Sequence, residues 1–306
     1  MSVIGLAAVR GPFENRANPQ RVAYDSFRAM GHEMLYAPLA PKWPLFPRRI
    51  DVLLTWNGVH AGRSAFVPQA RREGVGTVIL ERGFFDRMNH CQVDHLGWNH
   101  TASWSQSFDG TAPETGAAKL AESFGPTRPV QARDRGYILV LLQKAGDTQL
   151  IGASIALPDS LVAAVEQSVP DGLDIMARPH PKARWRRTPG QRAKIILGSL
   201  RDAVAGARFV VTINSNAGNE ALAWGCPVLC LGPSVYGRAG VVMTATPETL
   251  ASRIHLMLRG YCPAEPLATA YLRWLASRQF SNDELRQGDC LREALNNALE
   301  ARCQRN

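Results

Sequence analysis

Short, β-branched apolar runs alternate with amphipathic segments over most of the chain. Runs rich in valine, isoleucine and leucine predict buried strands, whereas apolar residues at three- and four-residue spacing predict helices. In the first half, the predicted strands are Val3–Val9, Glu33–Tyr36, Asp51–Trp56 and Gly76–Leu80. The predicted helices between them are Gln20–Met30 and Ser64–Glu73. This alternation favours a parallel sheet covered by helices.

The pattern stops over residues 82–135, which we predict to be irregular, and restarts after the turn-rich residues 125–135. The predicted strands of the second half are Tyr137–Leu142, Leu173–Ala177, Phe209–Ile213 and Pro227–Leu231. Its predicted helices are Ser160–Ser168, Leu197–Ala205, Pro247–Arg259 and a weaker pattern over Ala268–Ala301. We therefore predict an α/β protein with two Rossmann-like domains facing a cleft, residues 1–130 and 131–265. C-terminal helices over residues 266–306 could pack back on the first domain.

Composition describes a globular protein. Of its 306 residues 45% are hydrophobic and 20% charged, and no apolar run approaches the length of a membrane span. The N-terminal segment lacks a basic region and predicts a strand rather than a signal peptide, so we expect a cytoplasmic protein. Six cysteines without paired spacing favour neither disulfides nor zinc. The formal charge of +9 indicates anionic partners: nucleic acid, phosphorylated small molecules or an acidic membrane surface.

The segment Ala207–Pro233 is the centre of the second half. Its strand stops at Asn214-Ser215-Asn216, residue types that favour helix N-caps, and Gly218 permits close backbone approach. The helix that follows, Glu220–Trp224, ends at Gly225. Such a strand, turn and helix N-terminus predict an anion site, although an ordinary βαβ unit without a ligand explains the pattern equally well.

Three polar segments follow predicted strands of the second half: Gln143–Asp147, Arg178–Pro181 and Asn214–Glu220. Ligands of parallel sheets bind where strands end, so we expect these segments to share one site. The alternatives are that Asp147 only caps a turn and that His180 is structural. Basic residues at 178, 182, 184, 186, 187, 192 and 194 face either a phosphate or solvent.

Five motifs follow one another along the chain. They are Trp56-Asn57-Gly58, Glu81-Arg82-Gly83-Phe84, Gln143…Asp147, Arg178-Pro179-His180-Pro181 and Ser215…Gly218…Glu220-Ala221-Leu222…Gly225…Pro227-Val228…Gly232…Tyr236-Gly237. In this order they resemble the capsule polysaccharide biosynthesis family, and the resemblance covers about residues 50–240. Departures are Arg82 in place of an acid, Ala145-Gly146 before Asp147, and Gly237-Arg238-Ala239-Gly240 in place of a more aromatic segment.

The resemblance implies a GT-B glycosyltransferase that moves Kdo from CMP-Kdo, with retention, to a capsule or lipopolysaccharide-type glycan. The first domain would then bind the acceptor and the second the nucleotide sugar. We assign Asp147 as nucleophile and Glu81 as acid/base residue, with Asp86, Asp94 and His95 in reserve. The expected donor-binding residues are Gln143, Arg178, His180, Pro181, Lys182, Ser215, Asn216, Gly218 and Glu220, with longer-range attraction from Arg184. We expect no metal and no cofactor besides the donor.

Several alternatives stay open. The donor could be a UDP- or GDP-sugar, or the protein could be a basic nucleotide- or nucleic-acid-binding protein, or a relic that binds a nucleotide sugar without transfer. Nucleic acid is not an expected partner, because the sequence contains no nucleic-acid-binding signature. A glycan or glycolipid acceptor is expected, and peripheral contact with the anionic inner membrane is left open. The segment Asn89–Trp104 is either an acceptor-saccharide surface or a packed loop.

Overall fold

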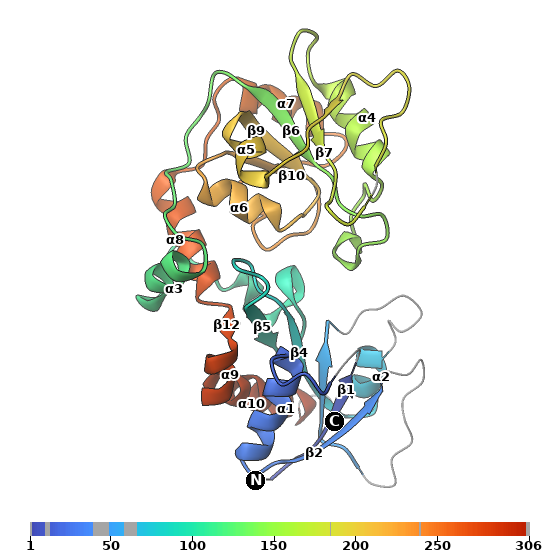
Figure 1. Cartoon of the computed structure of the whole chain (residues 1–306), viewed down its shortest axis with the longest axis vertical. Helices are drawn as coiled ribbons and strands as arrows, with labels where there is room; N and C mark the ends of the chain where they lie inside the picture. Colours follow the sequence, from blue (N-terminus) through green and yellow to red (C-terminus); the bar gives the residue numbers. More distant parts are fainter. Residues whose placement is uncertain are drawn as a thin grey trace. The chain divides into compact units, whose positions relative to one another are not determined.

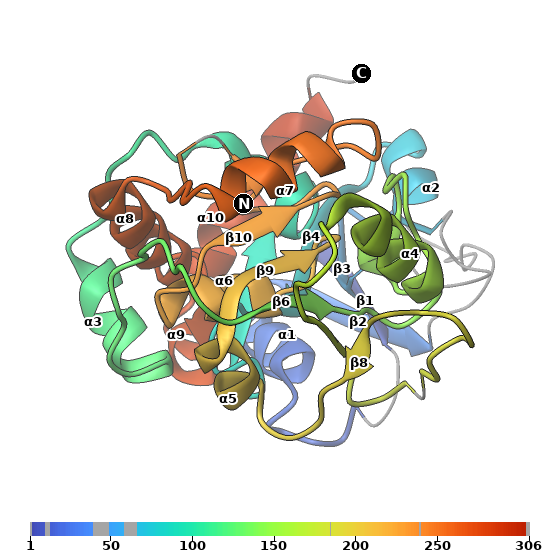
Figure 2. The same cartoon turned by 90° about the horizontal axis from the view of Figure 1, so that it is seen from above.

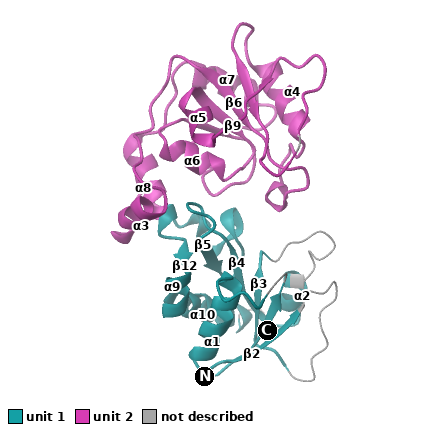
Figure 3. Ribbon diagram, in the orientation of Figure 1, with its two compact units in different colours: residues 1–108, 275–306 teal, residues 109–274 magenta. Residues whose placement is uncertain are grey.

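The chain forms two compact units, each with its own sheet (Figure 3). The computed structural model describes residues 2–9, 13–38, 49–57, 66–183, 185–238 and 240–303. Unit 1 comprises Met1–Phe108 and Leu275–Asn306, and unit 2 comprises Asp109–Trp274. The domain borders predicted from the sequence follow residues 130 and 265, whereas the units change after residues 108 and 274. Gly58, Arg184, Ala239 and the proline-rich residues 39–48 lie outside the described residues.

The sheet of unit 1 has the strand order β12-β5-β4-β3-β1-β2. Its strands are β1 (Ile4–Val9), β2 (Glu33–Pro38), β3 (Val52–Trp56), β4 (Gly76–Arg82), β5 (His90–Asp94) and β12 (Phe280–Ser281). Strands β1, β2, β3 and β4 are parallel to one another, whereas β5 pairs antiparallel with both β4 and β12. The buried runs of β1, β3 and β4 are apolar because a parallel sheet is covered on both faces.

Helices cover both faces of this sheet (Figure 1). They are α1 (Pro19–Ala29), α2 (Phe66–Arg72), α9 (Asn282–Gln287) and α10 (Asp289–Cys303), with short 3-10 turns η1 (Asn99–Thr101) and η2 (Ser103–Gln106). Phe27 of α1 and Leu295 of α10 belong to one apolar core, and Val67 of α2 belongs to the other. The C-terminal helices α9 and α10 thus complete the core of unit 1.

The sheet of unit 2 is entirely parallel, in the order β11-β10-β9-β6-β7-β8. Its strands are β6 (Tyr137–Leu141), β7 (Ile175–Arg178), β8 (Lys194–Ile195), β9 (Ala207–Thr212), β10 (Val228–Cys230) and β11 (Met243–Thr244). The helices are α3 (Thr115–Ser123), α4 (Pro158–Ser168), α5 (Leu200–Ala205), α6 (Ala217–Ala223), α7 (Leu250–Leu258) and α8 (Glu265–Ala276), with the 3-10 turn η3 (Thr148–Leu150). Helices α4 and α7 lie over one face, and α5 and α6 over the other (Figure 2).

These sheets confirm the predicted α/β class with two Rossmann-like halves. The prediction that residues 82–135 are irregular is wrong in part, because they include β5 and α3. The continuous helical pattern over Ala268–Ala301 is also broken, into α8, β12, α9 and α10. The break has local causes: the Ser281 side chain caps the start of α9, and Gly288 ends it with a left-handed φ of 87°.

Among the described residues, no helix is both long enough and apolar enough to span a bilayer.

Candidate functional site

The topological switch point of unit 2 lies between β6 and β9, because the chain winds outward from β6 to β7 and from β9 to β10. Ligands of such sheets bind in the crevice at the carboxyl ends of these two strands. Gln143 follows β6 and Asn214 follows β9, and the two buried amides pair across this point. Gln143 Nε2 donates to Asn214 Oδ1 (2.8 Å), and the Asn214 backbone N–H donates to Gln143 Oε1 (3.1 Å).

Asn214 joins three loops at this edge. Its Nδ2 donates to the carbonyl of Gln149 (2.5 Å), in the loop after β6, and to that of Pro233 (2.9 Å), after β10. The loops that follow β6, β9 and β10 are therefore tied together through a single buried side chain. The sequence placed Asn214 in the polar segment Asn214–Glu220 that follows a β-branched run, but it did not indicate that its side chain joins these loops.

Arg178 ends β7, the strand on the other side of β6. Its Nη2 donates to the carbonyl of Gly198 (2.9 Å), and its Nε is buried without a hydrogen-bond partner among the described residues. Burial lowers the pKa of Arg178, and the charge of Glu220 opposes that effect. Arg178 and Glu220 are therefore within electrostatic reach, and Arg178 retains a donor that a bound anion could satisfy.

His180 is half-buried, and its ring is oriented by the turn that follows β7. The backbone N–H of Lys182 donates to His180 Nδ1 (3.0 Å), so the proton of a neutral ring is on Nε2. His180 can consequently donate a hydrogen bond at Nε2. Pro181 and Lys182 are exposed on the same turn.

The turn between β9 and α6 differs from the predicted helix-capping site. Helix α6 begins at Ala217 and has only seven residues, and the side chain of Asn216 does not cap it. The Ser215 hydroxyl accepts from the Ala217 N–H (3.3 Å). Gly218 permits a close approach, but to a protein side chain: a Cβ there would lie 2.8 Å from the Tyr236 ring. Tyr236, whose hydroxyl donates to the Ser215 carbonyl (2.7 Å), was missed as a support of this turn.

Asp147 lies in the loop after β6 and caps the turn η3. Its Oδ1 accepts a hydrogen bond from the Gln149 N–H (3.0 Å). Because Gln149 is in turn bonded to Asn214, this loop is held at the switch point. Asp147 thus makes the turn-capping contact that the sequence allowed as an alternative role. Its assignment as nucleophile stays a prediction.

In unit 1, Glu81 lies near the carboxyl end of β4 and is 8% exposed. Its carboxylate accepts from Asn57 Nδ2 (2.5 Å) and from the Arg82 backbone N–H (2.8 Å). Burial raises the pKa of Glu81, and these two hydrogen bonds, with the guanidinium groups of Arg87 and Arg82, oppose that rise. A buried carboxyl whose pKa is raised holds its proton more readily than an exposed one, which suits an acid/base group.

A hollow of about 590 Å³ opens at the same edge of the unit 1 sheet. Arg82 and Trp56 line it, and the Arg82 guanidinium lies over the Trp56 ring, 5.9 Å from its centroid. The remaining lining residues are Asn15, Ala17, Asn18, Pro19, Gln20 and Met88. A cation, an aromatic face and amides in one hollow can bind a sugar that carries an anionic group.

The segment Asn89–Trp104 packs within unit 1. Trp98 is 6% exposed in a core cluster, and Trp104 lies edge-on to Phe84 with ring centroids 5.9 Å apart. Both tryptophans therefore have packing contacts, as in the packed-loop alternative. The Asp94 carboxylate accepts from the Ser103 N–H and hydroxyl and from two further backbone N–H groups.

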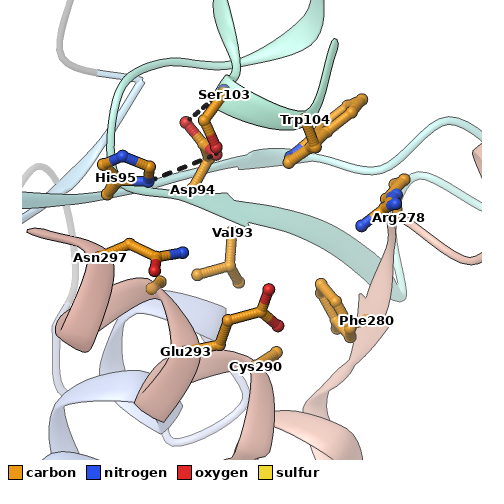
Figure 4. A pocket seen from close by; sticks show the side chains of 11 residues that line it. Val93, Asp94, His95, Ser103, Trp104, Arg278, Phe280, Cys290, Glu293 and Asn297 are labelled. Atoms are coloured by element: carbon orange, nitrogen blue, oxygen red, sulfur yellow. Dashed lines mark hydrogen bonds and ion pairs between the residues drawn. The ribbon is translucent and has the colours of Figure 1, made fainter. Parts of the chain in front are cut away.

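Asp94 also borders a second cavity, between β5, β12 and α10 (Figure 4). Glu293 and Asn297 of α10, Arg278 and Trp104 are among its lining residues. Its volume of about 60 Å³ suits a few water molecules rather than a sugar ring. In the described part of the chain, no three His, Cys, Asp or Glu side chains gather into a group that could hold a metal ion.

The fold and these strand-end sites define a GT-B-like protein. The family model for capsule polysaccharide biosynthesis proteins matches residues 117–278, more than half of the chain. The chain therefore belongs to the capsule polysaccharide biosynthesis protein family, which confirms the resemblance of its motifs.

Known proteins agree with this placement. The chain is 26% identical over 245 residues to Protein FixF of Sinorhizobium fredii, which covers 73% of this chain but only 58% of that protein's length. The structure is similar to two Thermosulfurimonas dismutans KpsC structures. The β-Kdo 2,4 transferase has a TM-score of 0.58 at 17% identity, covering 92% of this chain and 93% of that one. The β-Kdo 2,7 transferase has a TM-score of 0.57 at 18% identity, covering 96% and 99%. At these identities, the likeness supports the fold.

Of the predicted site residues, Gln143, Arg178, Ser215 and Glu220 come together with Asn214 at the carboxyl edge of the unit 2 sheet. Glu81 belongs to unit 1 and Asp147 to unit 2. Asn57 is the partner of Glu81 that the sequence analysis quoted only as part of a motif.

Proposed function

We propose that the protein is a glycosyltransferase that transfers a sugar from a nucleotide-sugar donor to a capsule- or lipopolysaccharide-type glycan. The observation that carries the proposal is the group of polar side chains at the switch point of unit 2. Gln143 and Asn214 hold the loops, while Arg178, with a buried donor available, lies within electrostatic reach of Glu220. This arrangement suits a nucleotide: cationic and N–H groups for its phosphate and a carboxylate for ribose hydroxyls.

We further propose CMP-Kdo as the donor and retention of the anomeric configuration. Support comes from membership of the family and from the two KpsC proteins with the same fold, which are β-Kdo transferases. A departing CMP builds charge on its phosphate, which Arg178 and His180 Nε2 could stabilise. In this mechanism the Asp147 carboxylate attacks the anomeric carbon as its bond to the CMP phosphate breaks. The acceptor hydroxyl then attacks the same carbon and displaces Asp147, while the Glu81 carboxylate accepts the hydroxyl proton.

On the acceptor side, the hollow of unit 1 favours a glycan with an anionic terminal residue. Arg82 supplies the charge, Trp56 the apolar face and Glu81, next to Arg82 in β4, the acid/base group. The arginine at position 82, a departure from the family motif, thus has a role on the acceptor side.

The test is ligand-dependent thermal stability with CMP, UDP, GDP and ADP, followed by product formation with CMP-Kdo. Selective binding of CMP should raise the melting temperature, since a ligand of the native state stabilises it by mass action. Stabilisation by UDP or GDP alone would contradict the proposed donor. Binding of CMP without product from any glycan acceptor would favour a nucleotide-sugar-binding protein without transferase activity.

A further inference from the structure

Helix α8 is linked to the donor site of unit 2 by a continuous chain of hydrogen bonds. Tyr271 of α8 is fully buried, and its hydroxyl donates to Oδ1 of Asn219 (2.9 Å), which is 1% exposed on α6. Asn219 Nδ2 donates to Asn216 Oδ1 (3.2 Å), and Asn216 Nδ2 donates to Glu220 Oε1 (3.4 Å). The chain of donors thus runs from the core to the carboxylate at the strand-end site.

The direction of this chain is set at the Glu220 carboxylate, which only accepts and therefore takes the Nδ2 donor of Asn216. Asn216 Oδ1 then accepts from Asn219 Nδ2, and Asn219 Oδ1 accepts from the Tyr271 hydroxyl. An amide that accepts at Oδ1 must present its Nδ2 on the other side. Asn219 is therefore held between Tyr271 and Asn216, and Asn216 is held between Asn219 and Glu220.

The Tyr271 ring is itself held firmly. The Arg238 guanidinium lies 6.0 Å from the centroid of the Tyr271 ring and 5.3 Å from that of Trp274. The two rings are neighbours on α8, with centroids 5.8 Å apart. The hydroxyl is therefore presented from a packed aromatic group, which defines its position better than a mobile side chain would.

We propose that Tyr271 and Asn219 are positioning residues of the donor site, which orient the Asn216 amide and the Glu220 carboxylate toward the nucleotide. The proposal rests on the proposed function, because it assigns Glu220 to the donor. Without the Tyr271 hydroxyl, the oxygen of the buried Asn219 amide loses its donor, so this amide is held less firmly. The Asn216 amide, which depends on Asn219 for its other hydrogen bond, is then held less firmly beside Glu220.

The test compares Tyr271→Phe with Tyr137→Phe. Tyr137 also has a hydroxyl bonded within unit 2, to the Ala203 carbonyl (2.7 Å), but it lies outside the chain of amides. Tyr271→Phe should weaken CMP binding, measured by calorimetry, about five- to ten-fold, as expected for the loss of one oriented hydrogen bond. Tyr137→Phe should leave the dissociation constant within about two-fold. Equal affinities in both variants would overturn the positioning role.

Two further measurements separate this role from general destabilisation. The side-chain amide NMR signals of Asn216, measured without ligand, should move in Tyr271→Phe and stay in Tyr137→Phe. Unmoved signals would overturn the relay, whereas failure of the wild-type protein to bind any of the four nucleotides would overturn the proposed function. In a double-mutant cycle with Glu220→Gln, the two changes should be non-additive for CMP affinity; additivity would contradict the relay.

Discussion

Replacement of Asn57 by glycine should raise the pKa of Glu81 further. Asn57 Nδ2 donates to the Glu81 carboxylate at 2.5 Å, and this bond favours the charged form. Glycine suits the position because Asn57 has a left-handed φ of 62°, which glycine adopts without steric cost. Alanine would add about 1–2 kcal/mol of backbone strain and confuse the result. Asn57→Gly therefore removes the amide without adding backbone strain.

The magnitude follows from the burial of both groups. Asn57 is 9% exposed and Glu81 8%, so solvent replaces the lost hydrogen bond poorly. A hydrogen bond to a charged group is worth about 1.5–3 kcal/mol, and one pH unit corresponds to about 1.4 kcal/mol. The pKa of Glu81 should rise by about one to two pH units. The Arg82 N–H bond remains and limits the change.

Stability should follow the same titration. Because its pKa is already raised, Glu81 binds a proton more tightly in the folded than in the unfolded protein. Its contribution to stability is therefore greatest below its ordinary pKa of 4.5 and is lost as the pH rises through the folded value. In Asn57→Gly, the loss of folding stability on ionisation of Glu81 should be larger by about 1.5–3 kcal/mol. This additional loss should occur entirely above pH 4.5.

Selective ¹³C labelling of glutamate carboxyl groups, with Glu81→Gln to assign the signal, measures this pKa directly. Asn89→Ala is the matched control, because its exposed amide is bonded to Asp86 rather than to Glu81. The control should leave the Glu81 titration in place. If Asn57→Gly also left it in place, the assignment of Asn57 as the group that stabilises the Glu81 carboxylate would be refuted.

Three further predictions concern unit 2. Asp147→Asn keeps the oxygen that caps η3 and removes only the charge, so transfer should be abolished with CMP affinity unchanged; wild-type turnover would exclude Asp147 as the nucleophile. His180→Ala should weaken CMP binding about ten-fold or more, through loss of the Nε2 donor to a phosphate, and an unchanged dissociation constant would exclude that contact. Gly218→Ala should destabilise the protein by about 1–3 kcal/mol, because its Cβ would overlap the Tyr236 ring, and thermal unfolding measures the loss.

Local patterns in the sequence predicted most of the parallel strands and the residues at their carboxyl ends. They include the positions of Gln143, Arg178 and Ser215, since apolar periodicity depends only on near neighbours in the chain. The family could also be recognised from the order of the motifs, and the family match over residues 117–278 confirms it. Strand β5 could not be predicted from the sequence, because only two of its residues, Cys91 and Val93, belong to the apolar core. Its partner strand β12 also lies nearly two hundred residues further along the chain.

By itself, the sequence determined the alternation of strands and helices, the family and the polar residues at the strand ends. Only the tertiary structure decided which side chains pair: Asn214 with Gln143, Asn57 with Glu81, and Tyr271 with Asn219. Chain order sets the local backbone conformation, whereas hydrogen-bond partners and pKa values depend on distance and burial in space. That is why Gly218, which the sequence suggested for approach to a ligand, packs against Tyr236 instead.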